Sequence, residues 1–310
     1  MTKVESIDRR LVHALQIDGR APFARIAEVL GTSEHTVARR YRGLVERGVR
    51  VVGVPNRFRL GYHAWTLRLR CTPDAGAALA RALAKRADTH FVHLMSGGTE
   101  ISCMQQVASA DELLLDRLPR RLVDVSAHAV LRGFTAPQTW RGVHCLTDEE
   151  VAALTVTRDH EAVELSGTDE ALLRVLAVDG RATFTQLAHA TSTSESTARR
   201  RVELLRRAGV LDVQLDADPA DLGFPTQARL WMSVRPSALA ETGRALAGHR
   251  EVYFAAATTG PRNLVASIAT TTTGELYRYL TERIGGLDGV NDVETAPVLR
   301  TLKRVDLTAE

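Results

Sequence analysis

The chain contains one segment twice, and this duplication limits the possible folds more than any other feature of the sequence. Residues 7–49 and residues 168–210 align without a gap, and 18 of the 43 paired positions are identical. The longest shared string is Asp-Gly-Arg-Ala, at 18–21 and again at 179–182. The spacing between the copies exceeds the period of about 20–50 residues that is typical of solenoid repeats. The sequence therefore predicts duplicated domains, and a chain of 310 residues has room for about two to four of them.

Each copy of the repeat has the pattern of three short helices. In the first copy, apolar residues recur at helical spacing over 7–17 and 23–30, and Gly19 is expected to end the first helix in a left-handed conformation. Ser33 is a suitable N-cap for a third helix, which closes at Gly48. Three helices with a glycine-containing turn before the third predict a helix-turn-helix, whose third helix enters the major groove of DNA.

The predicted third helices carry a local excess of positive charge, although the net charge of the whole chain is only +3. Residues 39–50 and residues 199–207 each contain five arginines against one glutamate. Arginines clustered on one helix indicate phosphate contact, and the alternative is a solvated basic face. The outward residues predicted to contact DNA are Ser33, Glu34, His35, Thr36, Arg39, Arg40 and Arg42 in the first copy, and Ser194, Ser196, Thr197, Arg199, Arg200 and Arg201 in the second.

The outward-facing sets differ between the copies. His35 becomes Ser196, Ala38 becomes Arg199, and Arg42 becomes Glu203. Because a glutamate repels phosphate, the second copy is the weaker DNA-binding candidate. The two copies need not prefer the same half-site.

A second pattern follows each helix-turn-helix. Strands are expected near 64–71, 90–96, 100–107 and 124–132, with helices near 74–86 and 110–120; the second copy repeats this order, with strands near 226–234, 252–258, 263–270 and 290–300 and helices near 236–248 and 273–285. The order βαββαβ predicts a four-stranded antiparallel sheet with both helices on one face. The open face of each sheet needs a cover, and the other copy is an obvious partner.

The whole pattern resembles the Lrp/AsnC, or feast/famine, family of transcriptional regulators, in a tandem form like that of actinobacterial members. The resemblance is carried by DGRAPFARIA at 18–27, by TSEHTVARR at 32–40, and in the second copy by AATTGPRNLV at 256–265 and TAPVLRTLK at 295–303. It implies an α+β protein with two tandem copies of a winged helix-turn-helix followed by a ferredoxin-like βαββαβ domain of the RAM type. In that family the βαββαβ domain dimerises and binds small effectors, often amino acids, so the resemblance also implies at least a homodimer.

The family's effector lies near a hairpin with a G-x-x-D pattern. Carried over to this sequence, the pattern and its surroundings fall on Gly97, Gly98, Thr99 and Glu100 in the first copy, and on Thr259, Gly260, Pro261 and Asn263 in the second. Both copies depart from aspartate at the fourth position. Backbone N–H groups in a glycine-rich hairpin could hold a carboxylate, and a Glu or Asn side chain could hold an ammonium group. The alternative is that these glycines only form a β-turn.

These patterns divide the chain into five segments. The predicted boundaries are a winged helix-turn-helix at 1–54, a βαββαβ domain at 55–134, a linker at 135–167, a second winged helix-turn-helix at 168–216, and a second βαββαβ domain at 217–310. Within the linker, Thr147 and Glu150 form a capping-box pattern ahead of a short helix.

Other features exclude several classes of protein. The three cysteines lack paired spacing, which favours reduced thiols and a cytoplasmic location, and no apolar run is long enough to span a membrane. Dinucleotide, P-loop, metal-pair and nucleophile-elbow motifs are missing from the sequence, so no catalytic residue, metal or cofactor is expected. The histidines, including His90, His93, His128, His144 and His160, are interpreted as surface or strand residues and not as ligands.

Three hypotheses follow. The first is a sequence-specific regulator that binds double-stranded DNA and responds to a small metabolite, with no role at a membrane. The second is an enzyme, because the decarboxylases of sirohaem conversion share this architecture. The third is a metabolite sensor with vestigial DNA-binding domains that acts through partner proteins.

Overall fold

The computed structural model describes residues 6–118, 122–135, 139–159 and 163–305. The chain folds into two compact units, each made from both copies of the repeat. One unit, here called the reader pair, contains the described residues up to Leu60 and those within Val143–Leu222. The other, here called the β-barrel unit, contains Gly61–Gly142 and Gly223–Arg304. None of the described helices is both long and apolar enough to cross a lipid bilayer.

The reader pair consists of two helix-turn-helix domains, reader 1 and reader 2. Reader 1 contains α1 (Ser6–Ile17), α2 (Phe23–Leu30) and α3 (Glu34–Glu46); reader 2 contains α6 (Gly167–Val178), α7 (Phe184–Thr191) and α8 (Glu195–Arg207). The core of reader 2 is built from Leu172, Leu176, Leu187, Val202 and Leu205, which are at most 1% exposed. The helical periodicity of the sequence therefore predicted the buried faces correctly.

The turns before the recognition helices α3 and α8 form as the sequence indicates. Gly31 adopts the left-handed conformation with φ of 64°, and Ser33 accepts a hydrogen bond from the backbone N–H of Thr36. In reader 2 a serine, Ser192, takes the left-handed position with φ of 53°, and Ser194 caps α8. The predicted capping box of Thr147 and Glu150 is also confirmed, at the start of α5 (Asp148–Leu154).

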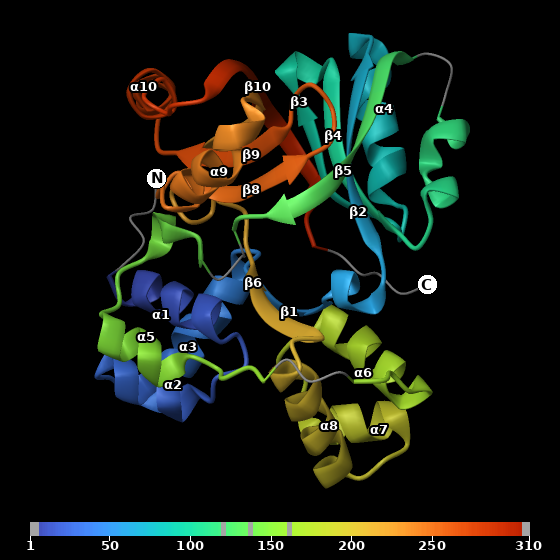
Figure 1. The fold of residues 1–310 in the computed structure, drawn as a ribbon. Helices are drawn as coiled ribbons and strands as arrows, with labels where there is room; N and C mark the ends of the chain where they lie inside the picture. Colours follow the sequence, from blue (N-terminus) through green and yellow to red (C-terminus); the bar gives the residue numbers. More distant parts are fainter. Residues whose placement is uncertain (1–5, 119–121, 136–138, 160–162, 306–310) are drawn as a thin grey trace. The chain divides into compact units, whose positions relative to one another are not determined.

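The strand after each reader joins the two readers. β1 (Arg50–Pro55) pairs antiparallel with β6 (Leu211–Asp216) over its whole length, from Arg50 opposite Asp216 to Pro55 opposite Leu211. The two strands cross the middle of the unit as one ribbon (Figure 1). Each reader therefore completes its fold with a strand from the other copy.

The β-barrel unit is one closed barrel of eight strands, four from each copy. Copy 1 supplies β2 (His63–Cys71), β3 (Thr89–Met95), β4 (Glu100–Val107) and β5 (Leu122–Gly133); copy 2 supplies β7 (Thr226–Val234), β8 (Val252–Thr258), β9 (Leu264–Thr270) and β10 (Val290–Lys303). The order is β10-β3-β4-β2-β5-β8-β9-β7. The last strand of each copy lies beside the other copy's sheet, so the two βαββαβ domains pair within one chain.

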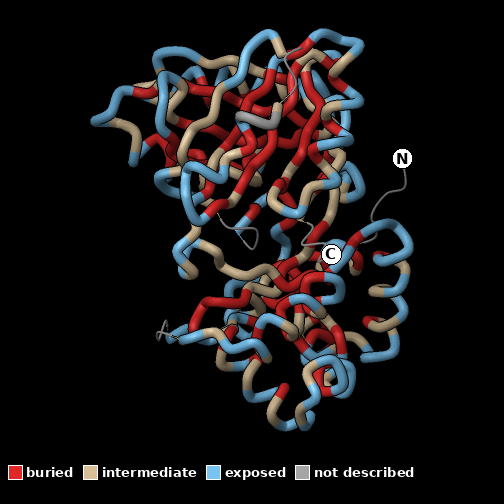
Figure 2. The backbone as a smooth tube through the Cα atoms, turned by 90° about the vertical axis from the view of Figure 1, so that its right-hand side faces the viewer, coloured by how far each residue is buried: buried red, intermediate tan, exposed pale blue. Residues whose placement is uncertain are grey.

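The burial pattern follows this architecture. The barrel strands carry most of the buried residues of the unit (Figure 2). α4 (Pro73–Ala84) packs on the outer face of copy 1 with Leu67, Leu69 and Leu83, and α9 (Leu239–Ala247) packs on copy 2 with Leu230 and Leu246. The expected strands and first helices agree with the structure to within a few residues.

The second helix of each βαββαβ domain departs from expectation. In copy 1 the helix expected near 110–120 is absent from the described residues, which form two 3₁₀ turns instead, Ala110–Glu112 and Leu114–Arg117. The connection between β4 and β5 is five residues shorter than that between β9 and β10, and the N–H of Leu114 bonds the side chain of Gln105 at 3.1 Å. In copy 2 the helix forms as α10 (Thr273–Arg278) and continues as one π-helical segment, Tyr279–Ile284.

Candidate functional sites

The recognition helices expose most of the side chains that the sequence assigned to DNA. Exposed residues are Ser33, Glu34, His35, Arg39 and Arg42 on reader 1, and Ser194, Ser196, Arg199 and Arg200 on reader 2. Thr36 and Thr197 are half-buried, and their hydroxyl groups lie 2.9 Å from those of Ser33 and Ser194. Arg199 also stacks over the ring of Phe184, at 4.2 Å from its centroid. Contact with DNA by these residues stays a prediction.

Two of the predicted DNA-contacting arginines have structural partners inside the protein. Arg201 binds the carboxylate of Asp169 in α6 with a distance of 2.7 Å from Nη2 to Oδ2, and donates to the carbonyl of Glu164. The equivalent Arg40 lies 3.7 Å from Asp8 in α1, and Asp8 also binds Arg47 at 2.9 Å. Asp8 and Asp169 are identical positions of the repeat. This pair therefore ties each recognition helix to the first helix of its reader.

The electrostatics of Asp169 fit this structural role. Its side chain is fully buried, and burial alone raises the pKa of a carboxyl group. Hydrogen bonds from Arg201 and Ser166 outweigh that effect and leave the pKa of Asp169 below its ordinary value. The carboxylate is therefore ionised and paired at neutral pH.

The repeated Asp-Gly-Arg-Ala string forms the contact between the readers. Arg20 donates to the carbonyls of Gly180 and Ala182 at 2.8 and 3.0 Å. Arg181 donates in return to the carbonyls of Gly19 and Ala21 at 2.6 and 3.0 Å. Each guanidinium also stacks on an aromatic ring of α2 or α7, Arg181 on Phe23 and Arg20 on Phe184. These reciprocal bonds relate the two readers by an approximate two-fold axis.

The expectation that Gly19 ends its helix in a left-handed conformation is wrong. Gly19 is not among the residues with positive φ, and neither is Gly180. A Cβ atom at Gly19 would lie 2.8 Å from Cγ1 of Val51, and one at Gly180 would lie 2.9 Å from the backbone of Val52. Both glycines are needed because the β1–β6 ribbon passes too close for a side chain. Identity of this string in both copies was the signal for a shared interface.

The reciprocal contact made by Arg20 and Arg181 is here called the clamp, and burial lowers the pKa of both arginines. Burial lowers the pKa of Arg20 to about 10, and repulsion from Arg206 and Arg181 adds to the effect. Arg206 in turn forms an ion pair with Asp18, across the contact between the readers. The clamp remains positively charged at neutral pH and its donors are satisfied by carbonyl groups, so it acts in assembly of the reader pair.

The hairpin predicted to hold an effector in copy 1 is closely tied to the barrel. Gly97 and Gly98 adopt positive φ angles of 67° and 95°, and the hydroxyl of Thr99 donates to the carbonyl of Ser96. Glu100 is only 5% exposed. Its carboxylate accepts bonds from Arg68 at 2.9 and 3.2 Å and from the indole N–H of Trp231 at 3.2 Å. An ammonium group of an effector would have to displace these bonds.

The equivalent hairpin in copy 2 packs against β5. Thr259 exchanges two bonds with Ala129, and a Cβ atom at Gly260 would lie 2.3 Å from Nδ1 of His128. The side-chain amide of Asn263 bonds both backbone groups of Val234, at 2.9 and 2.8 Å. Thr259, Gly260 and Pro261 are exposed. Effector binding at either hairpin stays a prediction, and the Glu100 and Asn263 side chains already have structural partners.

Comparison with known proteins decides the family. The AsnC-type helix-turn-helix domain matches residues 5–45 and 165–206, and the Lrp/AsnC ligand binding domain matches residues 227–307. The HTH-type transcriptional regulator FL11 of Pyrococcus horikoshii is 31% identical over 142 residues, which cover 46% of this chain and 93% of that protein. The chain belongs to the Lrp/AsnC family.

This Lrp/AsnC protein is also similar in sequence to a second regulator and in fold to an enzyme. The HTH-type transcriptional regulator Ptr1 of Methanocaldococcus jannaschii is 31% identical over 140 residues, 45% of this chain and 95% of that protein. The crystal structure of the siroheme decarboxylase NirDL superposes with a TM-score of 0.64 at 17% identity, over 96% of this chain and 92% of that one. That likeness shows a shared fold. The chain combines the helix-turn-helix and ligand-binding domains of an Lrp/AsnC-type transcriptional regulator.

The β-barrel unit of this Lrp/AsnC protein holds a network of charged residues, of which only Glu100 was singled out from the sequence. Arg68 links Glu100 to Glu294, at 2.7 Å from Nη2 to Oε2, and Arg262 binds Glu294 at 2.7 Å from the other side. Arg229 is 3% exposed and donates to the hydroxyl groups of Ser102 and Ser267 at 3.0 and 2.6 Å. Burial lowers the pKa of Arg229. These side chains come from five strands and the hairpin between β8 and β9, so no spacing in the sequence could have indicated them.

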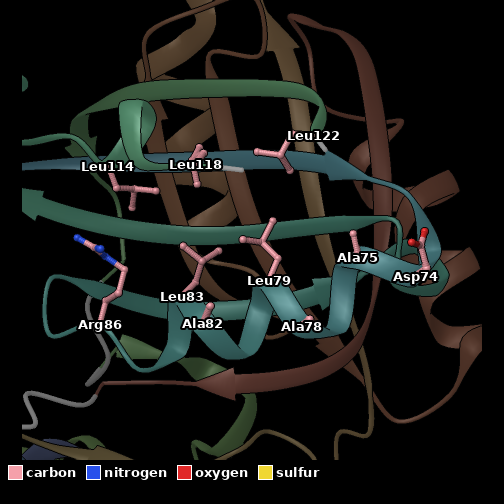
Figure 3. Close-up of a pocket in the computed structure, with 10 residues that line it drawn as sticks. All are labelled: Asp74, Ala75, Ala78, Leu79, Ala82, Leu83, Arg86, Leu114, Leu118 and Leu122. Carbon is pink, nitrogen blue, oxygen red and sulfur yellow. The ribbon is translucent and has the colours of Figure 1, made fainter. Parts of the chain in front are cut away.

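An apolar groove opens on copy 1 where the second helix was expected. Its volume is about 480 Å³. One wall is formed by α4, including Leu79 and Leu83, and the other by Leu114 and Leu118 at the second 3₁₀ turn and by Leu122 of β5 (Figure 3). Val123 and Val125 of β5 are 71% and 37% exposed. The shorter connection therefore leaves apolar surface exposed in copy 1. The equivalent surface of copy 2 is covered by its own α10 and π-helical segment.

The histidines do not form a ligand set among the residues that the structure describes. No group of three or more His, Cys, Asp or Glu side chains there could hold a metal ion. His90 and His93 are buried in β3, and His144 stacks on His13 of α1 with ring centroids 4.3 Å apart. His160 lies outside the described residues.

Proposed function

We propose that this protein is a sequence-specific transcriptional regulator that binds double-stranded DNA in the cytoplasm, with both recognition helices of the complex supplied by one chain. The observation that carries the proposal is the reader pair itself. Two AsnC-type helix-turn-helix domains are joined by the β1–β6 ribbon, and each exposes an arginine at the same helical position, Arg39 or Arg200. Such arginines reach phosphate oxygens or the O6 and N7 atoms of guanine.

The operator should consist of two unequal half-sites. The readers are related by the reciprocal clamps of Arg20 and Arg181, which supports a paired engagement of DNA like that of a symmetric dimer. The exposed residues differ at three helical positions, however, with Arg42 replaced by Glu203. At these three positions reader 1 therefore carries one more positive charge than reader 2, and a palindromic sequence matches only one reader at a time.

The βαββαβ domains are proposed to sense a small metabolite, such as an amino acid. The support is the match of residues 227–307 to the Lrp/AsnC ligand binding domain. Binding that favours one arrangement of the chain would change DNA affinity through linkage. We also propose that chains associate at least as dimers, which would present four readers with half-sites about 10 base pairs or a multiple apart.

Two alternative functions can each be tested by experiment. An enzyme of the siroheme decarboxylase type is suggested by the shared fold over nearly the whole chain. The exposed arginines of α3 and α8 favour DNA binding over this alternative. A purified protein that takes up sirohaem and decarboxylates it would establish the enzyme. A protein that binds a metabolite but no DNA would establish the sensor with vestigial readers.

Gel-shift measurements with the DNA upstream of the protein's own gene test the proposal. The variants are Arg39→Ala and Arg200→Ala, with the exposed Arg174→Ala on α6 as a matched control. Each recognition-helix variant should weaken binding about tenfold, whereas the control should leave it unchanged. Arg40 and Arg201 are left intact because each ties its recognition helix to the first helix of the same reader.

The same assay tests the unequal half-sites. Selection from random DNA should give an asymmetric consensus for the wild type, and binding should weaken as salt rises. Selection of a palindrome would contradict the half-site proposal, and absence of any sequence-dependent binding at low salt would contradict the function.

A further inference from the structure

A polar cavity of about 290 Å³ lies in copy 2, at the end of the sheet opposite the Thr259–Asn263 hairpin. It is formed where β8 begins and β9 ends, beside α10 and the π-helical segment. Phe224 and Tyr279 form part of its wall. Its charged lining consists of Arg250, Arg278, Arg283, Glu251, Glu275 and Glu282.

The charges of this cavity balance. Three arginines face three glutamates, so a ligand with a net charge gains little from the lining as a whole. A ligand that carries one positive and one negative group gains from both. Glu275 is already held, because its Oε2 atom accepts bonds from the N–H and hydroxyl of Thr271 at 3.0 and 2.7 Å. That leaves Glu251 as the inner carboxylate available to a ligand.

Glu251 differs from its counterpart in copy 1 in a way that indicates a ligand. Asp88 occupies the equivalent position, directly before the second strand, and its carboxylate is saturated by Arg86 at 2.8 and 2.7 Å and by Gln105 at 2.9 Å. In copy 2 the Oε2 atom of Glu251 is buried and has no hydrogen-bond partner among the described residues. A buried carboxylate oxygen without a partner is costly, and a donor from a ligand removes that cost.

The π-helical segment shapes the same cavity. Tyr279, Glu282 and Arg283 belong to it, and π-helical turns inside helices occur frequently at functional sites. Tyr279 is 3% exposed, and its hydroxyl lies 3.0 Å from Nδ1 of His249. Burial, together with the charge of Glu251, raises the pKa of Tyr279, which keeps the wall of the cavity neutral and aromatic.

We propose that this cavity binds a free α-amino acid, with the ammonium group on Glu251 and the carboxylate on the arginines at the rim. The inference rests on the proposed function, in which the βαββαβ domains sense a metabolite such as an amino acid, and what it adds is a site other than the hairpins. Phe224 is the second residue of the chain after it leaves the reader pair at Leu222. A ligand against Phe224 therefore contacts the segment that connects the two units.

The test uses the full-length protein and the twenty L-amino acids as probes. Thermal shift identifies which amino acids stabilise the wild type, and isothermal titration calorimetry then gives their affinities. Glu251→Gln keeps the size of the side chain and removes its charge, and Arg278→Gln does the same at the rim. Glu241→Gln, at an exposed position of α9, is the matched control.

The expected result is binding of at least one amino acid that Glu251→Gln and Arg278→Gln each weaken about tenfold or more, with the control unchanged. The N-acetyl and amide derivatives of that amino acid should be weakened similarly, because each lacks one of the two charges. No amino acid binding by the wild type, or binding that both variants retain, overturns the inference. Gel shifts separate the two proposals, since DNA binding without amino acid binding rejects this site alone.

Discussion

The two copies of the repeat share the order of their helices and strands but differ in the side chains at equivalent positions. In copy 1 the carboxylate of Asp88 is saturated by Arg86 and Gln105, and the outer face of the sheet is left partly open. In copy 2 the equivalent Glu251 keeps a free oxygen, and α10 with its π-helical segment covers that face. The same division appears in the readers, where Glu203 of copy 2 replaces Arg42 of copy 1.

This comparison indicates how a fused dimer can specialise. In a symmetric homodimer every substitution appears at both sites, so a change that improves one function alters both subunits. Here the shared positions include those that join the copies, such as Arg20 with Arg181 and Gly19 with Gly180. The copies differ at some positions predicted to contact DNA, such as Arg42 and Glu203, and at the cavity position of Glu251, where copy 1 has Asp88. Conserved pairing and diverged surfaces together suggest a division of labour between the copies.

The largest difference in stability should come from the aspartates that anchor the recognition helices. Asp169→Ala removes a fully buried carboxylate and leaves Arg201 without its partner, which should cost about 4 kcal/mol of unfolding free energy. Asp8→Ala should cost about 1 kcal/mol, because Arg40 lies 3.7 Å away and Arg47 is 41% exposed. Urea denaturation of both variants measures this difference.

The pH dependence of the free energy of unfolding is the control for the Asp169 prediction. Because the pKa of Asp169 is lowered in the folded protein, its stabilisation is complete above the ordinary carboxyl pKa near 4 and is lost as the pH falls through the lower folded value. Equal costs for the two variants at neutral pH would show that the copies anchor their recognition helices equally well.

The sequence predicted the parts of each copy better than the contacts between them. Helices and strands followed from periodicity, because Val202 and Leu205, or Leu67 and Leu69, repeat at the spacing of their element. The partner of Arg201 could not be found this way, since Asp169 is 32 residues distant and a basic helix looks the same whether or not its arginines are paired.

Pairing between the copies was still harder to predict. The closed barrel depends on β5 meeting β8 and β10 meeting β3, contacts that no local pattern encodes. The cavity of copy 2 gathers Phe224, Glu251 and Arg283 from three separate segments. The described residues of copy 1 do not form the expected second helix, and the shorter connection between β4 and β5 was a signal of this. The run of leucines at 113–115 nevertheless favoured a helix.

Acidification should distinguish the two readers. His13 of α1 is 2% exposed, and its Nδ1 atom accepts bonds from the N–H groups of Cys145 and Leu146, both at 3.1 Å. Burial lowers its pKa to about 4, with repulsion from His144 and Arg9 adding to the effect. Because the unfolded chain binds the proton more readily, the stabilisation is complete above about pH 6.5 and is lost as the pH falls toward 4, by up to about 3 kcal/mol.

Reader 2 carries an exposed arginine, Arg174, at the position equivalent to His13 and should show no such transition. Hydrogen exchange of the α1 and α6 amides at pH 7 and pH 5 measures the difference. Protection should fall in α1 and persist in α6, and a His13→Gln variant should reduce the pH dependence of α1. Parallel loss of protection in both helices would show that the readers open as one unit.

The smallest predicted difference in stability lies between the outer faces of the two βαββαβ domains. Leu79 lines the open groove of copy 1, whereas the equivalent Thr242 is 2% exposed and donates to the carbonyl of Asp288 at 3.3 Å. Thr242→Leu should destabilise the protein by about 2 kcal/mol, because the larger side chain overpacks a filled space and the hydrogen bond is lost. The reverse change, Leu79→Thr, should cost about 1 kcal/mol, because Leu79 is only half-buried and loses little apolar burial. Melting temperatures rank the two variants, and a larger cost for Leu79→Thr would mean that the groove of copy 1 is filled in solution, by another chain or by a ligand.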